Sequence, residues 1–183
     1  MNVLLGVSGG IAAYKAADLV SQCRRKGWNV RVVMTRGATE FVRPLTFEAL
    51  SDHPVMTDAL ATGHAPDGAS AIEHIAWAKW AHVAMVAPLT ASTLAKLATG
   101  IADDALTTVW LALPAHVPSL LAPAMNTAMW EQPVVQRNLR WLDELGRHVL
   151  VPPVSKRLAC GDVGVGGLAE VADLVAALEA HAP

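Results

Sequence analysis

The chain of 183 residues carries little charge and only two cysteines. Lysine and arginine total 14 against 16 acidic residues, so the formal net charge of -2 gives no electrostatic reason to expect a nucleic-acid partner. Charged residues make up only 16% of the chain, which argues against disorder. The two cysteines, Cys23 and Cys160, are too few for a disulfide framework or a four-cysteine zinc site, and we expect no metal.

Long apolar runs are also lacking. No stretch of about 18 uninterrupted apolar residues is present, so we expect no membrane-spanning helix. The first residues enter a strand pattern without a basic segment, so we expect no secretory signal. Even so, 53% of the residues are hydrophobic, which indicates surface that is buried in an oligomer. The composition therefore favours a cytoplasmic, self-associating protein of one domain, residues 1–183.

Short apolar runs rich in β-branched residues alternate with helical patterns along the chain. We expect buried strands at residues 3–7, 30–34 and 83–87, and weaker strands at 119–122 and 149–151. Helical patterns cover residues 11–26, 90–98 and 131–145. This alternation predicts βαβ units and a parallel sheet that is covered on both faces. The expected fold is therefore α/β, a single doubly wound parallel sheet in a Rossmann-like or flavodoxin-like three-layer arrangement.

Two segments interrupt this rhythm. Residues 52–73 and 152–168 contain many glycine, alanine or proline residues and read as long loops. Loops of that length in a compact domain are usually functional or mobile. We therefore expect the second segment to be a mobile loop.

Ligands of an open parallel sheet bind beyond the carboxyl ends of its strands. That rule selects four places along one edge: Ser8-Gly9-Gly10, Thr35, residues 88–93 and residues 123–126. The glycine turn opens a helix, whose first N–H groups suit a phosphate, and Thr90, Ser92 and Thr93 add hydroxyls at a second helix start. A tight turn and simple helix capping explain the same residues. Two phosphate-friendly loops on one edge favour a nucleotide-like cofactor.

Three further residues could carry chemistry. His74 follows the first long loop, although a lone histidine between apolar neighbours is more often structural. Asn126 follows a strand end, where its amide would point into the same edge. Cys160 lies in a glycine-rich loop, an unusual place to bury a thiol, whereas Cys23 falls on the apolar face of the first helix and is expected in the core.

Taken in order, these segments resemble the flavin-containing cysteine decarboxylases. That family includes phosphopantothenoylcysteine decarboxylase of coenzyme A synthesis and the peptidyl-cysteine decarboxylases of lantibiotic-type pathways. The resemblance spans nearly the whole chain. It rests on GVSGGIAAYK (6–15), MT (34–35), EHI (73–75), APLTAST (87–93), GIADD (100–104), PAMNTAMW (123–130) and ACGD (159–162).

The resemblance implies a flavin, FMN or else FAD, held between subunits of a homotrimer or a trimer-based homododecamer. It implies flavin contacts from Ser8, Gly9, Gly10, Thr35, Thr90, Ser92 and Thr93. It also implies substrate contacts from Asn126, Met129, Trp130, Ala159 and Gly161, with residues 152–168 covering the substrate.

The implied reaction first oxidises the cysteine thiol to a thioaldehyde. The thioaldehyde can accept the electron pair that remains at Cα when CO₂ leaves. Decarboxylation then yields an enethiol. His74 would assist thiol oxidation as a base, and Asn126 would hold the carboxylate. In the coenzyme A enzymes, a cysteine matching Cys160 then donates a proton and the product is a saturated thiol. In the peptide enzymes the enethiol leaves.

The chain departs from the family pattern at three positions. Ser92 stands where the family has Asn, Leu89 where it has Ala, and Gly167 where the glycine loop usually continues with Arg. Cys160 favours 4'-phosphopantothenoylcysteine as the substrate, giving 4'-phosphopantetheine. Gly167 and the lack of a fused synthetase favour a peptide with a C-terminal cysteine. Both substrates stay open.

Two other classes of protein are alternatives to a cysteine decarboxylase. The related flavin prenyltransferases lack the PAMN and loop-cysteine motifs. Some family members are regulatory subunits that bind a phosphatase, and these lose part of the catalytic set or carry long acidic extensions. This chain keeps His74, Asn126 and Cys160, which favours an enzyme, a carboxy-lyase. A colourless protein that fails to bind flavin would support the regulatory alternative.

Overall fold

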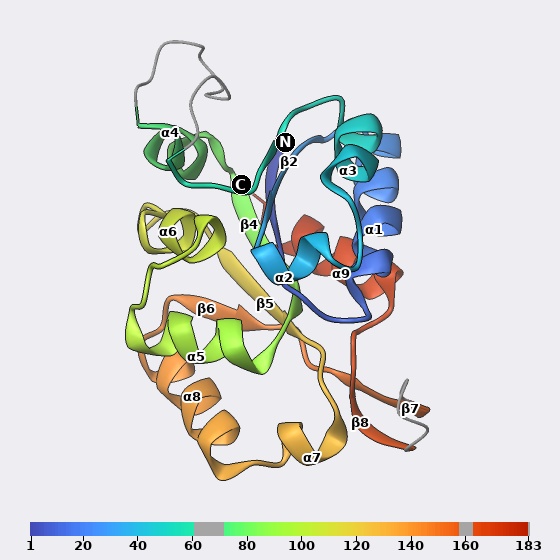
Figure 1. Ribbon diagram of the computed structural model, residues 1–183, viewed down its shortest axis with the longest axis vertical. Coiled ribbons are helices and arrows are strands. Elements are labelled where there is room, and N and C mark those ends of the chain that lie inside the picture. Colours follow the sequence, from blue (N-terminus) through green and yellow to red (C-terminus); the bar gives the residue numbers. More distant parts are fainter. Residues whose placement is uncertain (61–71, 158–162, 183) are drawn as a thin grey trace.

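The computed structural model describes residues 1–60, 72–157 and 163–182. Its centre is a six-stranded sheet in which every pair of neighbours is parallel (Figure 1). The strands follow the order β3-β2-β1-β4-β5-β6. Their bounds are β1 Asn2–Val7, β2 Asn29–Met34, β3 Val55–Met56, β4 Val83–Leu89, β5 Ser119–Pro123 and β6 His148–Leu150.

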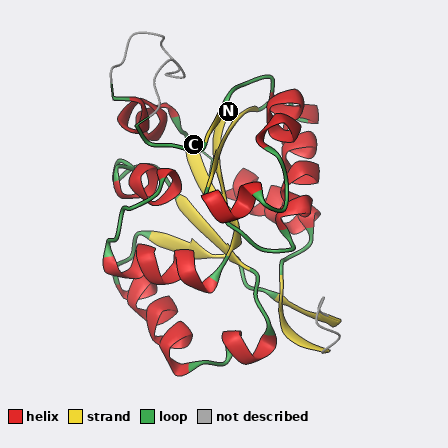
Figure 2. Cartoon of the chain, viewed as in Figure 1, coloured by secondary structure: helices red, strands yellow, loops and turns green. Residues whose placement is uncertain are grey.

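Helices cover both faces of this sheet, which makes three layers (Figures 1 and 2). One face carries α1 (Ala13–Arg25), α3 (Pro44–Ser51) and α9 (Val171–Ala180). The other carries α4 (Glu73–Trp80), α5 (Ala91–Thr99), α6 (Ala105–Leu111) and α8 (Pro133–Glu144). The short helices α2 (Arg36–Thr39) and α7 (Thr127–Trp130) lie beyond the carboxyl ends of β2 and β5.

The strand sequences explain this double cover. In β1, Val3, Leu5 and Val7 belong to the core under α1 and α9, whereas Leu4 belongs to the core under α4 and α6. Alternate residues of β2 and β4 divide in the same way. A strand that is buried on both faces is apolar at every position rather than at every second one. The continuous apolar runs in the sequence have this origin.

The expected α/β class and doubly wound parallel sheet are confirmed. The order β3-β2-β1-β4-β5-β6 is that of the Rossmann fold, with its switch point between β1 and β4. Each strand expected from the sequence is present within two residues of its expected bounds. The helical patterns correspond to α1, α5 and α8.

Both segments that read as long loops hold strands. The first contains β3, and its residues 61–71 lie outside the described part of the chain. The second contains an antiparallel hairpin of β7 (Val154–Arg157) and β8 (Val163–Gly167). Glycine is depleted in strands, so the sequence VGVGG gives no strand signal. The interpretation of residues 152–168 as wholly irregular is therefore wrong.

Among the described residues, no helix combines the length and apolar character needed to cross a bilayer. The same residues hold no cluster of three or more histidine, cysteine or acidic side chains that could bind a metal ion.

Candidate functional site

The site begins at the switch point, where the chain leaves β1 toward one face and β4 toward the other. Ser8 joins these two exits. Its fully buried Oγ donates to the carbonyl oxygen of Pro88 at 2.7 Å and accepts from the N–H of Thr90 at 2.9 Å. The Thr90 hydroxyl lies 3.2 Å from Ser8 Oγ. The expected contact of these two loops is therefore present, and a buried serine fixes it.

The two glycines after Ser8 have different surroundings. A side chain on Gly9 would overlap backbone atoms of Gly37 in α2, with its Cβ 2.8 Å from the Gly37 carbonyl oxygen. A Cβ on Gly10 would meet only the methyl group of Thr90, at an ordinary 3.5 Å. Gly9 thus allows α2 to approach the turn, while Gly10 leaves space between the turn and Thr90.

That space adjoins the start of α1, which has no side-chain cap. The Ala13 and Lys15 N–H groups donate to the carbonyl oxygens of Gly10 and Ala12, so this helix start attracts an anion through its dipole and its remaining N–H groups. Small residues, the positive end of the helix dipole and the Thr90 hydroxyl therefore form a cradle of the kind that a phosphate needs. The residues present fit the phosphate group of FMN.

The remaining hydroxyls of this edge mainly cap helices. The Thr35 side chain accepts from the Ala38 N–H at the start of α2. The Thr90 side chain accepts from the Thr93 N–H at the start of α5, and the two hydroxyls lie 3.2 Å apart. Ser92 is exposed and Thr93 is buried. The capping interpretation is confirmed for Thr90, and Thr35 caps a helix that the sequence did not predict, while flavin contacts by these residues stay a prediction.

Asn126 also caps a helix. Its Oδ1 accepts from the Ala128 N–H at 2.8 Å, which starts α7. This bond settles which end of the side-chain amide is the acceptor. The other end of the amide, Nδ2, is a donor, which is the polarity that a carboxylate ligand requires.

The hairpin β7–β8 packs directly on this segment. The Met125 N–H donates to the carbonyl oxygen of Gly166 at 2.9 Å. A side chain on Gly166 would collide with the Met125 carbonyl oxygen, and a Cβ on Gly164 would lie 2.6 Å from Thr127 Oγ1. The glycines of β8 are therefore needed for the close approach of the hairpin to Asn126.

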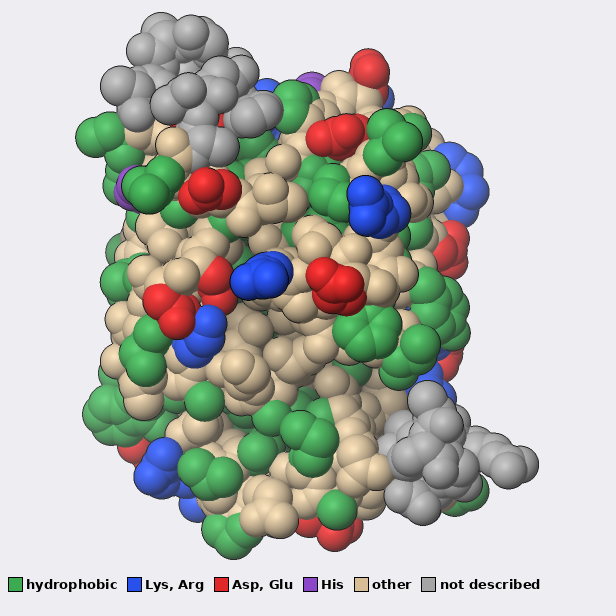
Figure 3. Space-filling view, in the orientation of Figure 1, with side chains coloured by type: hydrophobic (Ala, Val, Ile, Leu, Met, Phe, Trp, Pro, Cys, Tyr) green, Lys and Arg blue, Asp and Glu red, His purple; other side chains and the backbone are tan. Residues whose placement is uncertain are grey.

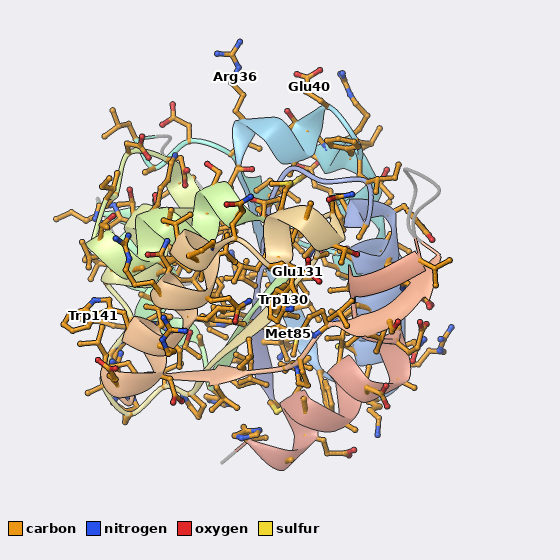
Figure 4. All side chains as sticks on the ribbon, turned by 90° about the horizontal axis from the view of Figure 1, so that it is seen from below. Arg36, Glu40, Met85, Trp130, Glu131 and Trp141 are labelled. Atoms are coloured by element: carbon orange, nitrogen blue, oxygen red, sulfur yellow. The ribbon has the colours of Figure 1, made fainter. Side chains whose placement is uncertain are left out.

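The two candidate substrate residues of α7 differ in surroundings. Met129 is 46% exposed. Trp130 instead borders a hollow of about 300 Å³ between α8 and the β5–β6 edge. Figure 4, which views the sheet from its carboxyl end, places Trp130 toward the middle of this end. Arg36 and Glu40 point away from it.

His74 does not join these residues within one chain. It lies on α4, at the opposite end of the molecule from α7 (Figure 1). The Asn2 side chain donates to the carbonyl oxygen of Trp80 at the far end of α4, which places that helix beside the beginning of β1. A site that uses both His74 and Asn126 therefore requires two copies of the chain.

An aromatic clamp fastens α4 to the sheet. The guanidinium of Arg31, from β2, lies 5.0 Å from the Trp77 ring and 5.3 Å from the Trp80 ring. Burial lowers the pKa of Arg31, and the nearby Glu73 carboxylate opposes this shift. His74 follows Glu73 on this helix and is half-buried. Its Nδ1 has no hydrogen-bond partner within the described part of the chain. The sequence pattern gave no sign of this clamp.

Three predicted site residues, Ala159, Cys160 and Gly161, lie outside the described residues. The GIADD motif, in contrast, has a structural task. The Asp104 side chain accepts from the Thr107 N–H to cap α6, and Lys96 pairs with both Asp103 and Asp104. Burial opposes ionisation of Asp104, but the Thr107 and Lys96 contacts lower its pKa overall.

This chain is similar to known proteins over nearly its whole length. A family model described as Flavoprotein matches residues 1–182. The probable phosphopantothenoylcysteine decarboxylase of Streptococcus mutans is 46% identical over 178 residues, 97% of each chain. The coenzyme A biosynthesis bifunctional protein CoaBC of Bacillus subtilis is 48% identical over 180 residues. That alignment spans 98% of this chain but 43% of the bifunctional protein.

Solved structures agree with these relatives. A PPC decarboxylase mutant complexed with pantothenoylaminoethenethiol superimposes with a TM-score of 0.87 at 36% identity, over 98% of this chain and 96% of its own. The FMN binding protein AtHal3 gives 0.81 at 37% identity, over 98% and 95%. The FMN-dependent cysteine decarboxylase SpaF gives 0.76 at 33% identity, over 97% and 94%.

Proposed function

Because the chain belongs to the flavoprotein family, we propose that it binds FMN and decarboxylates 4'-phosphopantothenoylcysteine to 4'-phosphopantetheine in coenzyme A synthesis. The main support is the match to a decarboxylase of similar length, 46% identical over 97% of both chains. The bifunctional relatives match over less than half of their length, so the chain corresponds to one of their two parts. The proposed location is the cytoplasm.

The switch-point edge is the proposed FMN site. The turn Ser8-Gly9-Gly10 and the start of α1 would hold the phosphate, with Thr90 closing the cradle. Thr35, Ser92 and Thr93 would line the same edge. FMN, when bound, would supply reversible hydride acceptance, which a decarboxylation needs if it is to proceed through an oxidised thiol.

This chain's residues would then handle the substrate. Asn126 would hold the cysteine carboxylate through Nδ2, and Met129 and Trp130 would border the substrate beside it. His74 would accept the thiol proton. Cys160, between Ala159 and Gly161, would return a proton to the enethiol, so that the product is a saturated thiol with no net redox change.

The proposed assembly is a homotrimer or a trimer-based homododecamer, in which His74 of one copy completes the site of another. Two observations support self-association. His74 and Asn126 occupy opposite ends of one chain (Figure 1). In addition, large apolar side chains next to the switch-point edge are exposed: Ile11 60%, Tyr14 61% and Phe41 50%. Figure 3 shows apolar side chains on the surface near this edge.

Mass spectrometry of anaerobic reactions tests the function. The FMN-loaded protein is incubated with 4'-phosphopantothenoylcysteine and, separately, with a short peptide that ends in cysteine. We expect the small thiol to lose the mass of CO₂ alone and the peptide to stay unchanged. The variant His74→Asn, with its FMN content checked by absorbance, is the matched control and should give no product.

Two outcomes contradict the proposal. If FMN-loaded protein leaves the small thiol unchanged, the coenzyme A assignment is wrong. If the peptide instead loses CO₂ together with two hydrogens, the protein is an oxidative peptide decarboxylase. The similarity to SpaF is the observation that keeps this alternative. Protein that binds no flavin would favour a regulatory subunit.

A further inference from the structure

One departure from the family pattern has a structural counterpart. Gly167 lies at the end of β8, at the position where the resemblance implies an arginine. The side chain of Lys156, from the partner strand β7, lies across it. A Cβ on Gly167 would be 2.8 Å from Cγ and 2.9 Å from Cδ of Lys156, and would collide with its Cε. The lysine stem therefore fills the space in which any side chain at position 167 would begin.

The ammonium group of Lys156 ends at the base of the hairpin. It donates to the carbonyl oxygen of Leu168 at 2.9 Å and lies 3.5 Å from Oε1 of Glu170. The other oxygen of that carboxylate accepts from Lys15 of α1 at 3.2 Å. Exposed ion pairs contribute little, but a charged donor on a backbone carbonyl makes a stronger bond. Lys156 thus connects β7 to the segment after β8 and, through Glu170, to α1.

The position of the hairpin matters for Asn126. Gly164 and Gly166 hold β8 against Thr127 and Met125, on either side of Asn126. Each of these contacts depends on close approach, so a small displacement of β8 would disturb the segment that carries the amide. Lys156 binds the carbonyl oxygen of Leu168, directly after β8, and β8 is only five residues long, so this bond acts on the strand whose Gly164 and Gly166 contact the Asn126 segment.

We propose that Lys156 is a positioning residue that holds the base of the hairpin with a cation supplied from β7. Lys156 touches no reacting atom in this arrangement. It holds the hairpin base, and through β8 it holds Asn126. The pair Lys156 and Gly167 is then one unit, since the lysine stem lies where a side chain at 167 would start.

Hydrogen exchange of the FMN-loaded protein tests this unit without any assay of activity. Amide exchange of peptides that cover β7 and β8 is measured by mass spectrometry, with β1 as the internal reference. We expect Lys156→Ala to speed exchange in the hairpin roughly tenfold, as expected for loss of one charge-assisted hydrogen bond, and to leave β1 unchanged.

The decisive variants are a rescue and its control. Lys156→Ala combined with Gly167→Arg should return hairpin exchange to within about threefold of the wild type, because an arginine now supplies the cation from the other strand. Lys156→Ala with Gly167→Ala adds the Cβ but no charge and should not rescue. The proposal fails if Lys156→Ala leaves exchange unchanged, or if the two double variants behave alike.

Steady-state kinetics add a second readout, which rests on the proposed function. Lys156→Ala should raise KM for 4'-phosphopantothenoylcysteine roughly tenfold, with kcat changed less and FMN content unchanged, and the arginine double variant should reverse the KM effect. A fall in kcat alone would contradict a positioning role. If the wild type shows no decarboxylation, the proposed function fails while the exchange comparison still decides the role of Lys156.

Discussion

The side chain of Asn126 has a structural task and a proposed chemical one. Its oxygen starts α7 by accepting from Ala128, and its nitrogen is the proposed carboxylate donor. Sequence analysis found the residue from its place after a strand end, but could not find the cap, because capping depends on the backbone turn that follows. The same holds for Thr35, whose helix cap is visible only in the structure, whereas the cap at Thr90 could be predicted because a clear helical pattern follows it.

The substitution Asn126→Asp separates the two tasks. Aspartate caps helices as well as asparagine does, so the unfolding midpoint should change little. The donor, however, becomes a negative charge facing the substrate carboxylate, and kcat/KM should fall at least about 100-fold. Urea unfolding and product formation are measured on the same preparation. A fully active Asn126→Asp protein would contradict the assignment.

Cys23 should be unreactive in the folded protein. Cys23 is buried in the core under α1, as expected from the sequence, and burial raises its pKa to about 12. Its thiolate, the reactive form, is therefore scarce at neutral pH. In a Cys160→Ser variant a thiol reagent at pH 8 should find no reactive group in the folded protein and one group in urea. Rapid reaction of the folded variant would contradict the burial.

At the scale of elements, the apolar strands and the helices α1, α5 and α8 could be predicted because burial imposes a plain pattern on each. The helix α4 could not. Its sequence EHIAWAKW is apolar around nearly its whole circumference, since Trp77 and Trp80 clamp Arg31 while Ala78 faces the core. The apolar residues of this segment therefore show no helical spacing that would predict a helix. The β7–β8 hairpin could not be predicted for another reason. The glycines of β8 allow close approach to Met125 and Thr127, but they give no strand signal in the sequence.

The approach of α2 to the glycine turn gives an element-scale prediction. Gly9→Ala places a methyl group against the backbone of Gly37, which has no flexible end to move aside. We expect a loss of about 1–3 kcal/mol in unfolding free energy. Gly10→Ala is the control, because its Cβ meets only the Thr90 methyl at ordinary distance. Equal unfolding midpoints for the two variants would show that α2 does not pack as described.

His148, in the edge strand β6, makes the free energy of unfolding depend on pH. Burial, with a smaller effect from Arg147, lowers the pKa of His148 from 6.5 to about 4. Between these values the unfolded chain binds the proton and the folded chain does not, so stability falls as pH drops from 6.5 toward 4. His148→Gln should flatten this slope in urea unfolding at several pH values. The exposed His116→Gln control should keep it.

At the scale of the whole molecule, the strand order explains why two loops of the candidate site could be predicted to meet, although the position of His74 could not be predicted. The carboxyl ends of β1 and β4 are adjacent, so their loops had to meet. Nothing in a single sequence places α4 relative to α7, because that distance depends on the three-dimensional path between them. Their separation is the observation that calls for a second copy.

Complementation tests the shared site. His74→Asn and Asn126→Asp are each expected to be inactive alone. When both are co-expressed and assemble at random, about a quarter of the sites should receive His74 from one variant and Asn126 from the other, with activity to match. The separately purified variants, mixed only after assembly, serve as the control. Co-expressed assemblies without activity would mean that each site draws both residues from one chain.

The packing of α9 has a consequence for the growing polypeptide. Leu174, Val175 and Leu178 of this helix lie in the same core as Val3 and Leu5 of β1, the first strand to be made. On the ribosome, α1 and α3 can cover part of that face early, but the part under α9 stays open until residues 171–180 have emerged, whereas the helices of the opposite face, α4, α5, α6 and α8, are all made before then. The order of synthesis therefore leaves an apolar part of the nascent sheet exposed until the last helix has been made.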